Sequence, residues 1–105
     1  MYNELGKGFL EKVYENSLVY LIRKDGINCK AQEPINVYFV GINVGQYFAD
    51  ILVENKIILE LKVCEKIRPE HEAQLLHYLK ATGMKVGYIL NFGNKEKLEF
   101  KRMVL

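Results

Sequence analysis

The sequence has no tryptophan, only two prolines and two cysteines, and almost no excess of charge. Cys29 and Cys64 lie far apart and match no metal-ligand spacing, so we expect neither a zinc site nor a disulfide framework. We recognise no signal peptide and no apolar run of about 18 residues, and we therefore expect a cytoplasmic protein that does not bind membranes. The 15 basic and 13 acidic residues leave a net charge of +2, which neither requires nor excludes a nucleic-acid partner.

The chain does contain enough apolar side chains for one folded domain. Half of its 105 residues are hydrophobic and seven are tyrosines, a composition that excludes a disordered chain. A chain of this length buries roughly two-thirds of its unfolded surface around a single core. We find no repeat, linker or low-complexity segment, and we expect residues 1–105 to form one domain.

The stretch from Asp50 to Lys62 is typical of two antiparallel strands joined by a tight turn. Two aliphatic, β-branched runs flank the polar residues 54–56, which centres the turn near Asn55. Folding the chain there places Asp50 opposite Glu60, and the period of two puts Lys62 on the same side of the sheet. Three charged side chains are therefore expected on one face of the hairpin.

Two carboxylates that face each other across a hairpin repel, and this repulsion requires compensation. Facing Cβ atoms lie ~4.5–5.5 Å apart, and two unit charges at about 5 Å repel by roughly 3 kcal/mol at an effective dielectric near 20. Mg²⁺ or Mn²⁺ would turn this repulsion into attraction, since both prefer carboxylate oxygens. The alternative is a half-exposed hairpin in which Lys62 neutralises a neighbour while Ile57, Leu59, Leu61 and Val63 face the core.

The hydrophobic pattern predicts an α/β fold with the element order α-β-β-β-α-β-β. Helices are expected over residues 9–24 and 69–81, and strands over residues 35–40, 44–53, 57–63, 86–92 and 98–104, with a turn at 41–43 and a short extended piece over 27–32. The helix between the third and fourth strands predicts that they are parallel and that the sheet is mixed. Both helices are expected to cover the face that carries the three charges.

Each predicted helix brings polar residues to the edge of its apolar stripe. In the first, Glu11 borders a stripe made by Leu10, Val13, Tyr14, Leu18, Leu21 and Ile22, where the simplest alternative is a pair with Lys7 or Lys12. In the second, Gln74 and Tyr78 share a face beside the buried set Ala73, Leu75, Leu76 and Leu79. A half-buried polar role is expected for Gln74 and Tyr78, with an ordinary surface position as the alternative.

These motifs, in this order, resemble the PD-(D/E)xK nuclease superfamily and its RecB-like branch. The resemblance consists of Asp50, then Glu60-Leu61-Lys62, then Gln74 and Tyr78 in a Gln-x-x-x-Tyr helix. The segment from Gly8 through Glu11 to Tyr14 is similar to the signature of the GxxExxY proteins, and Asn91-Phe92-Gly93 with Lys101-Arg102 resembles the end of that family. The resemblance covers nearly the entire chain.

The resemblance implies a restriction-endonuclease-like core, a mixed sheet flanked by helices, and a Mg²⁺-dependent nuclease acting on DNA more than RNA. It makes Asp50 and Glu60 metal ligands together with the carbonyl of Leu61, and Glu11 a further ligand. Lys62 would orient the attacking water or stabilise charge on the phosphate, and Gln74 and Tyr78 would hydrogen-bond the Lys/Glu pair or the phosphate. All of these residues are therefore candidates for the catalytic site.

Two departures from the family pattern are visible. Such proteins usually carry another helical segment before the position of Leu5-Gly6, and we expect that segment to be missing here. An arginine often precedes the aspartate, whereas this chain has Tyr47-Phe48-Ala49, so one basic phosphate contact is expected to be absent.

Two other classes of function stay open. The domain would be a catalytically inactive module that binds nucleic acid or a protein partner, or a structural module in which Lys62 bonds both carboxylates. Exposed sheet edges over residues 35–40 or 98–104 would also allow a homodimer by sheet extension, although no residue pattern requires one.

Overall fold

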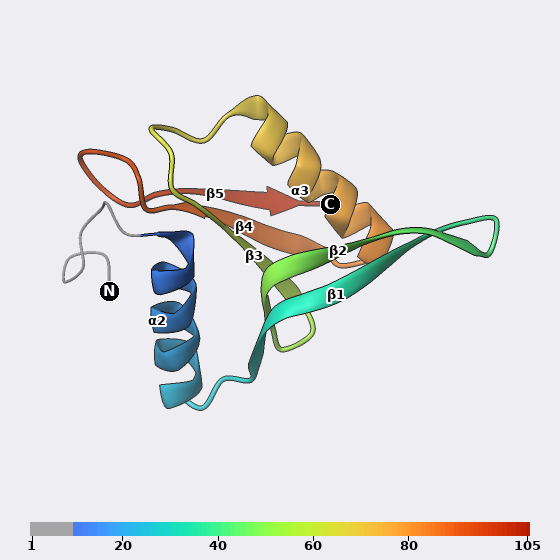
Figure 1. The fold of residues 1–105 in the computed structure, drawn as a ribbon, viewed down its shortest axis with the longest axis horizontal. Helices are drawn as coiled ribbons and strands as arrows, with labels where there is room; N and C mark the ends of the chain where they lie inside the picture. Colours follow the sequence, from blue (N-terminus) through green and yellow to red (C-terminus); the bar gives the residue numbers. More distant parts are fainter. Residues whose placement is uncertain (1–9) are drawn as a thin grey trace.

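The computed structural model describes residues 10–105, which form an α/β fold with the predicted element order. The elements are α2 (Glu11–Lys24), β1 (Cys29–Phe39), β2 (Ile42–Val53), β3 (Ile57–Lys62), α3 (Pro69–Thr82), β4 (Val86–Asn91) and β5 (Glu99–Val104) (Figure 1). The strands lie in one sheet in the order β1-β2-β3-β4-β5, with β3 and β4 parallel and all other neighbours antiparallel. The predicted mixed sheet is confirmed.

Both hairpin turns have the backbone geometry that tight hairpins favour. Glu54 and Asn55 have φ of 53° and 55°, and Val40 and Gly41 have φ of 51° and 75°. Positive φ at both central residues is the signature of a type I′ turn, whose twist matches that of the flanking strands. The turn predicted near Asn55 is confirmed, whereas the first turn begins at Val40 rather than at residue 41.

The short extended piece predicted over residues 27–32 is not separate from the next strand. β1 runs without interruption from Cys29 to Phe39 and includes Pro34, which pairs with Phe48 of β2. β1 is an edge strand, so it has a neighbouring strand on one side only. A proline is tolerated there because no hydrogen bond from its nitrogen is needed on the open side.

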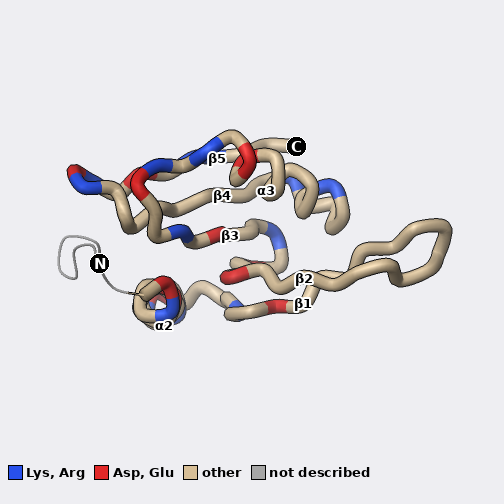
Figure 2. The backbone as a smooth tube through the Cα atoms, turned by 45° about the horizontal axis from the view of Figure 1, so that its top comes forward, with Lys and Arg blue, Asp and Glu red and all other residues tan. Residues whose placement is uncertain are grey.

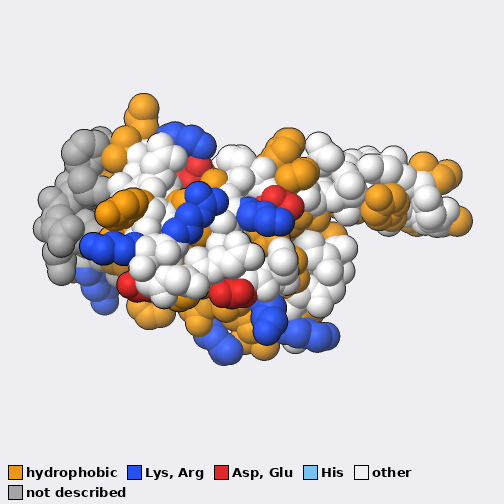
Figure 3. All heavy atoms as spheres, turned by 90° about the horizontal axis from the view of Figure 1, so that it is seen from below, with side chains coloured by type: hydrophobic (Ala, Val, Ile, Leu, Met, Phe, Trp, Pro, Cys, Tyr) orange, Lys and Arg blue, Asp and Glu red, His pale blue; other side chains and the backbone are white. Residues whose placement is uncertain are grey.

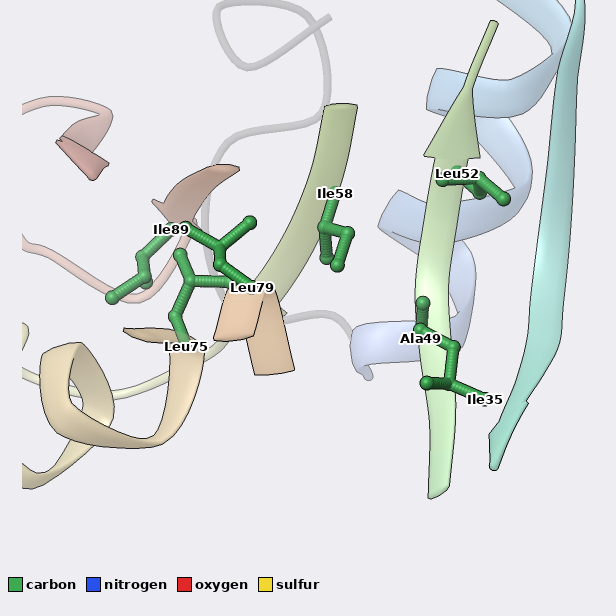
Figure 4. Close-up of a cluster of buried hydrophobic side chains, with 7 residues drawn as sticks. All are labelled: Ile35, Ala49, Leu52, Ile58, Leu75, Leu79 and Ile89. Atoms are coloured by element: carbon green, nitrogen blue, oxygen red, sulfur yellow. The ribbon is translucent and has the colours of Figure 1, made fainter. Parts of the chain in front are cut away.

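The two helices lie on opposite faces of the sheet. Leu75 and Leu79 of α3 pack with Ile58 and Ile89 in one buried cluster (Figure 4). The second cluster contains Tyr14 of α2 with Cys29, Ile51, Leu61 and Phe92. Successive strand residues point to opposite faces, so strand neighbours such as Ile51 and Leu52 join different clusters. The expectation that both helices cover one face is therefore wrong.

The apolar stripe of α2 is narrower than its sequence pattern suggests. Tyr14 is fully buried, but Leu10, Val13 and Leu21 are exposed. In α3, Leu75 and Leu79 are fully buried and Ala73 is exposed, contrary to expectation. Neither helix within residues 10–105 combines the length and apolar character needed to cross a membrane.

The outer half of the β1–β2 hairpin extends beyond the rest of the sheet (Figure 1). β3 pairs only with Ile51 to Val53 of β2, which leaves the longer part of β2 paired with β1 alone. This part of the hairpin has no charged residue between Asn36 and Ala49. Its exposed apolar residues are visible at the tip in Figure 3, and the large ones are Tyr38, Phe39, Val40, Ile42, Val44 and Phe48.

Candidate active site

Asp50 lies where β2 and β3 separate. The last pair of this ladder is Ile51 with Leu59, and Asp50 is the next residue of β2. Its Oδ2 accepts a hydrogen bond from the backbone N–H of Leu61 at 2.8 Å. The side chain thus pairs with a strand N–H at the end of the ladder, which holds the carboxylate between the two strands.

Glu60 meets Asp50 on the same side of the sheet. The two carboxyl groups lie near enough for Asp50 to act on Glu60 through its charge and through a side-chain hydrogen bond. Burial, and then repulsion from Asp50, raise the pKa of Glu60 to about 8, although the charge of Lys62 acts in the opposite direction. The Oε1 atom of Glu60 is buried and has no hydrogen-bond partner. An orphaned buried carboxylate oxygen is unusual in a native fold and requires an explanation.

Glu11, at the start of α2, lies near the same carboxyl groups. Partial burial and repulsion from Asp50 raise the pKa of Glu11 to about 7, and a hydrogen bond to Asp50 contributes. Its predicted partner Lys12 instead forms a salt bridge with Glu15 at 2.6 Å. Lys7 and Gly8 lie outside the described residues.

Lys62 is half-buried and provides the positive charge of the site. The charge of its ammonium offsets part of the rise in the pKa of Glu11 and of Glu60. Within residues 10–105, however, no salt bridge of 4.0 Å or less involves Lys62. A structural module with Lys62 bonded to both carboxylates is not what the described residues form. Figure 2 shows an acidic and a basic position close together on β3, in contrast to the uncharged outer hairpin.

Tyr78 and Gln74 approach the site from α3. The ring of Tyr78 stacks on that of Tyr47, with centroids 3.3 Å apart and an interplanar angle of 13°. Burial and the negative charge of Glu60 raise the pKa of both tyrosines, and a hydrogen bond from Gln74 partly offsets this for Tyr78. Gln74 itself is exposed. Tyr78 thus borders the carboxylates, whereas Gln74 reaches them only through Tyr78.

Sequence reasoning missed Tyr47, Gln32 and Glu15. The hydroxyl of Tyr47 is buried without a hydrogen-bond partner, and Glu60 acts on its pKa. Nε2 of Gln32 donates hydrogen bonds to Glu15 Oε1 and to Asp50 Oδ1. Glu15 was the available signal. It directly follows Tyr14, which is fully buried, and a charged residue is rarely buried unless it is paired.

The Asn91-Phe92-Gly93 motif fastens the chain just after Lys62. Asn91 is fully buried, and its Oδ1 accepts hydrogen bonds from the N–H groups of Cys64 and Gly93, both at 3.0 Å. A Cβ at position 93 would lie 2.4 Å from the backbone nitrogen of Cys64, so only glycine fits. The backbone N–H of Phe92 donates a hydrogen bond to the carbonyl oxygen of Lys62 at 2.9 Å. The ring of Phe92 stacks on the ring of Tyr14. The motif therefore positions the end of β3.

The structure therefore brings Asp50, Glu60, Glu11, Lys62 and Tyr78 together. Within residues 10–105, no group of three or more His, Cys, Asp or Glu side chains is arranged to hold a metal ion. Two contacting carboxyl groups and one orphaned oxygen nevertheless suit a small cation that prefers oxygen ligands.

A mixed five-stranded sheet between two helices, with acidic residues at its centre, defines an α/β protein with a restriction-endonuclease-like fold. Residues 1–103 match the PD-(D/E)XK nuclease superfamily, and the chain belongs to this superfamily. A solved structure entitled "Crystal structure of SSO0001" is similar, with a TM-score of 0.63 and 16% identity. The match covers 89% of this chain and 50% of that chain, and at this identity the likeness concerns the fold alone. A comparison with curated proteins found no match.

Proposed function

We propose that this protein is a Mg²⁺- or Mn²⁺-dependent nuclease that hydrolyses phosphodiester bonds, in DNA more than in RNA. The observation that carries the proposal is the contact between Asp50 and Glu60, with one buried Glu60 oxygen left without a donor. Such an arrangement is unfavourable in the charged state unless a cation is bound. Membership of the nuclease superfamily supports this function, and we assign the chain to the GxxExxY group of the RecB-like branch as part of the proposal.

The residues that would hold the ion are Asp50, Glu60 and the carbonyl of Leu61, with Glu11 as a further ligand. A bound divalent cation supplies a water of lowered pKa and neutralises charge on the phosphate. The N–H of Leu61 orients Asp50 through the hydrogen bond to Oδ2, so this ligand is held before any ion binds.

Lys62 and Tyr78 act on the substrate side of this site. The ammonium of Lys62 orients the attacking water or stabilises charge on the phosphate, since no carboxylate of the described residues holds it in a salt bridge. Tyr78 donates its hydroxyl to the phosphate or to the Lys/Glu pair, and the hydrogen bond from Gln74 orients that hydroxyl.

The test is a cleavage assay with Mn²⁺ on plasmid, linear duplex, single-stranded DNA and RNA. Lys62→Ala is expected to lower the cleavage rate by about 100-fold or more, the usual cost of removing one charge-stabilising donor. Lys56→Ala is the matched control, because Lys56 lies in the exposed turn at the other end of β3. Equal cleavage by wild type and Lys62→Ala would reject the mechanism.

Calorimetry with Mn²⁺ separates this proposal from a catalytically inactive module. We expect binding to the wild-type protein and none to Asp50→Ala. Absence of binding to the wild type at millimolar Mn²⁺ would favour a module that binds nucleic acid or a protein without cleavage.

A further inference from the structure

We propose that Gln32 is a positioning residue that holds Asp50 in the orientation needed for metal binding, and that Glu15 in turn holds Gln32. The role in catalysis rests on the proposed nuclease function. The positioning itself concerns only the chain's own residues and is testable without metal or substrate.

Each oxygen of Asp50 accepts a hydrogen bond from an uncharged donor of the chain. Oδ2 accepts the N–H of Leu61 at 2.8 Å, and Oδ1 accepts Nε2 of Gln32 at 3.4 Å. With a donor on each oxygen, the carboxylate cannot rotate freely. Removing an outer group that orients a ligand in this way typically lowers metal affinity by about 10- to 100-fold.

The same nitrogen of Gln32 donates to Oε1 of Glu15, and an amide nitrogen has two hydrogens, one for each carboxylate. Because both partners are acceptors, the nitrogen rather than the oxygen of the amide must face them. Glu15 is itself fixed, since its side chain is buried and its Oε2 bonds Lys12 at 2.6 Å. The chain of contacts therefore runs from Lys12 through Glu15 and Gln32 to Asp50.

The chemistry of an amide suits this place better than that of a cation. A lysine or arginine beside Asp50 would neutralise it and compete with a divalent ion for the same oxygens. Glutamine donates two hydrogen bonds without charge, so the negative charge of Asp50 remains available. The positive charge that balances Glu15 is kept one step away, on Lys12.

The backbone of Gln32 is adapted to this role. Its φ of 51° is left-handed, although the residue lies within β1. Ala31 pairs with Ile51 and Glu33 with Ala49, but the pair between them, Gln32 with Asp50, is missing from the ladder. Non-glycine residues persist in this conformation only where their surroundings hold them, as they commonly do at functional sites.

The test compares Gln32→Met, which keeps the length but removes the donor, with Gln46→Met. Gln46 lies on the same hairpin, and its Nε2 donates to Asn36 Oδ1 at 2.9 Å away from Asp50, so it is a matched control. Without metal, hydrogen exchange of the Leu61 amide is expected to be about tenfold faster in Gln32→Met and unchanged in the control. With metal, calorimetry is expected to show about tenfold weaker Mn²⁺ binding in Gln32→Met alone.

Folded Gln32→Met with unchanged Leu61 exchange would overturn the proposal. If the wild type neither binds Mn²⁺ nor cleaves nucleic acid, the proposed function fails, and the metal-free exchange experiment alone decides the role of Gln32. If Gln32→Met does not fold, Gln32→Asn replaces it, because the shorter amide cannot span both carboxylates. The same acceleration of Leu61 exchange is expected from it, and unchanged exchange would again overturn the proposal.

Discussion

At the scale of the residue, the site is a set of carboxyl groups whose protonation differs between the folded and unfolded chain. The pKa of Glu60 rises from 4.5 to about 8 on folding, and that of Glu11 rises to about 7. Between about pH 4.5 and pH 8, the folded protein therefore binds more protons than the unfolded chain. The free energy of unfolding therefore falls as the pH rises through this window.

This linkage predicts the pH dependence of stability in metal-free buffer. The melting temperature of the wild type is expected to fall between about pH 5 and pH 8, because Glu60 and Glu11 lose the protons that folding favours. Glu60→Gln, which keeps the neutral form at all pH values, is expected to flatten the profile. Thermal denaturation followed by circular dichroism measures the melting temperature of both proteins at each pH. A wild-type melting temperature that rises with pH would contradict the raised pKa values of Glu60 and Glu11.

At Glu60, we expect the requirements of stability and of function to conflict. At pH 8 without metal, Glu60→Gln is expected to be more stable than the wild type, because a buried charge is replaced by a neutral group. Mn²⁺ is expected to raise the melting temperature of the wild type and not that of Glu60→Gln, since only the wild type provides both carboxylates. A shift of equal size in both proteins would show that the ion binds elsewhere.

At the scale of the element, the β3–α3 and β4–β5 connections are locked together by the Asn91-Phe92-Gly93 motif. Gly93 approaches the backbone of Cys64 so closely that a methyl group does not fit. Asn91 also donates Nδ2–H to Glu99 at 2.9 Å, and Glu99 accepts the N–H of Ile67. The part of the chain that follows Lys62 therefore depends on a few buried hydrogen bonds.

Gly93→Ala is expected to destabilise the protein by about 1–3 kcal/mol, the usual range for overpacking a close contact. Gly45→Ala is the matched control, because a Cβ at Gly45 would meet nothing within 4 Å and its φ is ordinary. Urea denaturation of the two variants measures the difference. Equal stabilities would mean that the contact between Gly93 and Cys64 is relaxed in solution.

At the scale of the whole molecule, the charged site and the apolar hairpin are separated. The hairpin tip carries large exposed apolar side chains (Figure 3) and no charge (Figure 2), whereas Glu60 and Lys62 of the site lie on β3, the central strand of the sheet. β1 and β5 are the two edges of the sheet, and a homodimer formed by sheet extension would use one of them. The outer part of β1, from Asn36 to Phe39, carries no charge and so lacks one of the usual protections against pairing with another copy.

Sedimentation velocity tests this association. If β1 is the contact, Val37→Lys within the edge strand is expected to shift the protein from dimer to monomer, because a charge would be brought to the two-fold interface. Lys101→Ala on β5 is not expected to do so. A monomeric wild type at all concentrations would reject the homodimer.

Local patterns alone determined the element order, the turn at Asn55 and the meeting of Asp50 with Glu60, because turn chemistry and the period of two act over only a few residues. Only the tertiary structure decided that the helices cover opposite faces, that Tyr47 stacks on Tyr78, and that the strands part at Asp50. Those features depend on contacts between segments distant in sequence. The left-handed Gln32 belongs with them, because its side chain bonds Glu15 and Asp50, which are both distant from it in sequence.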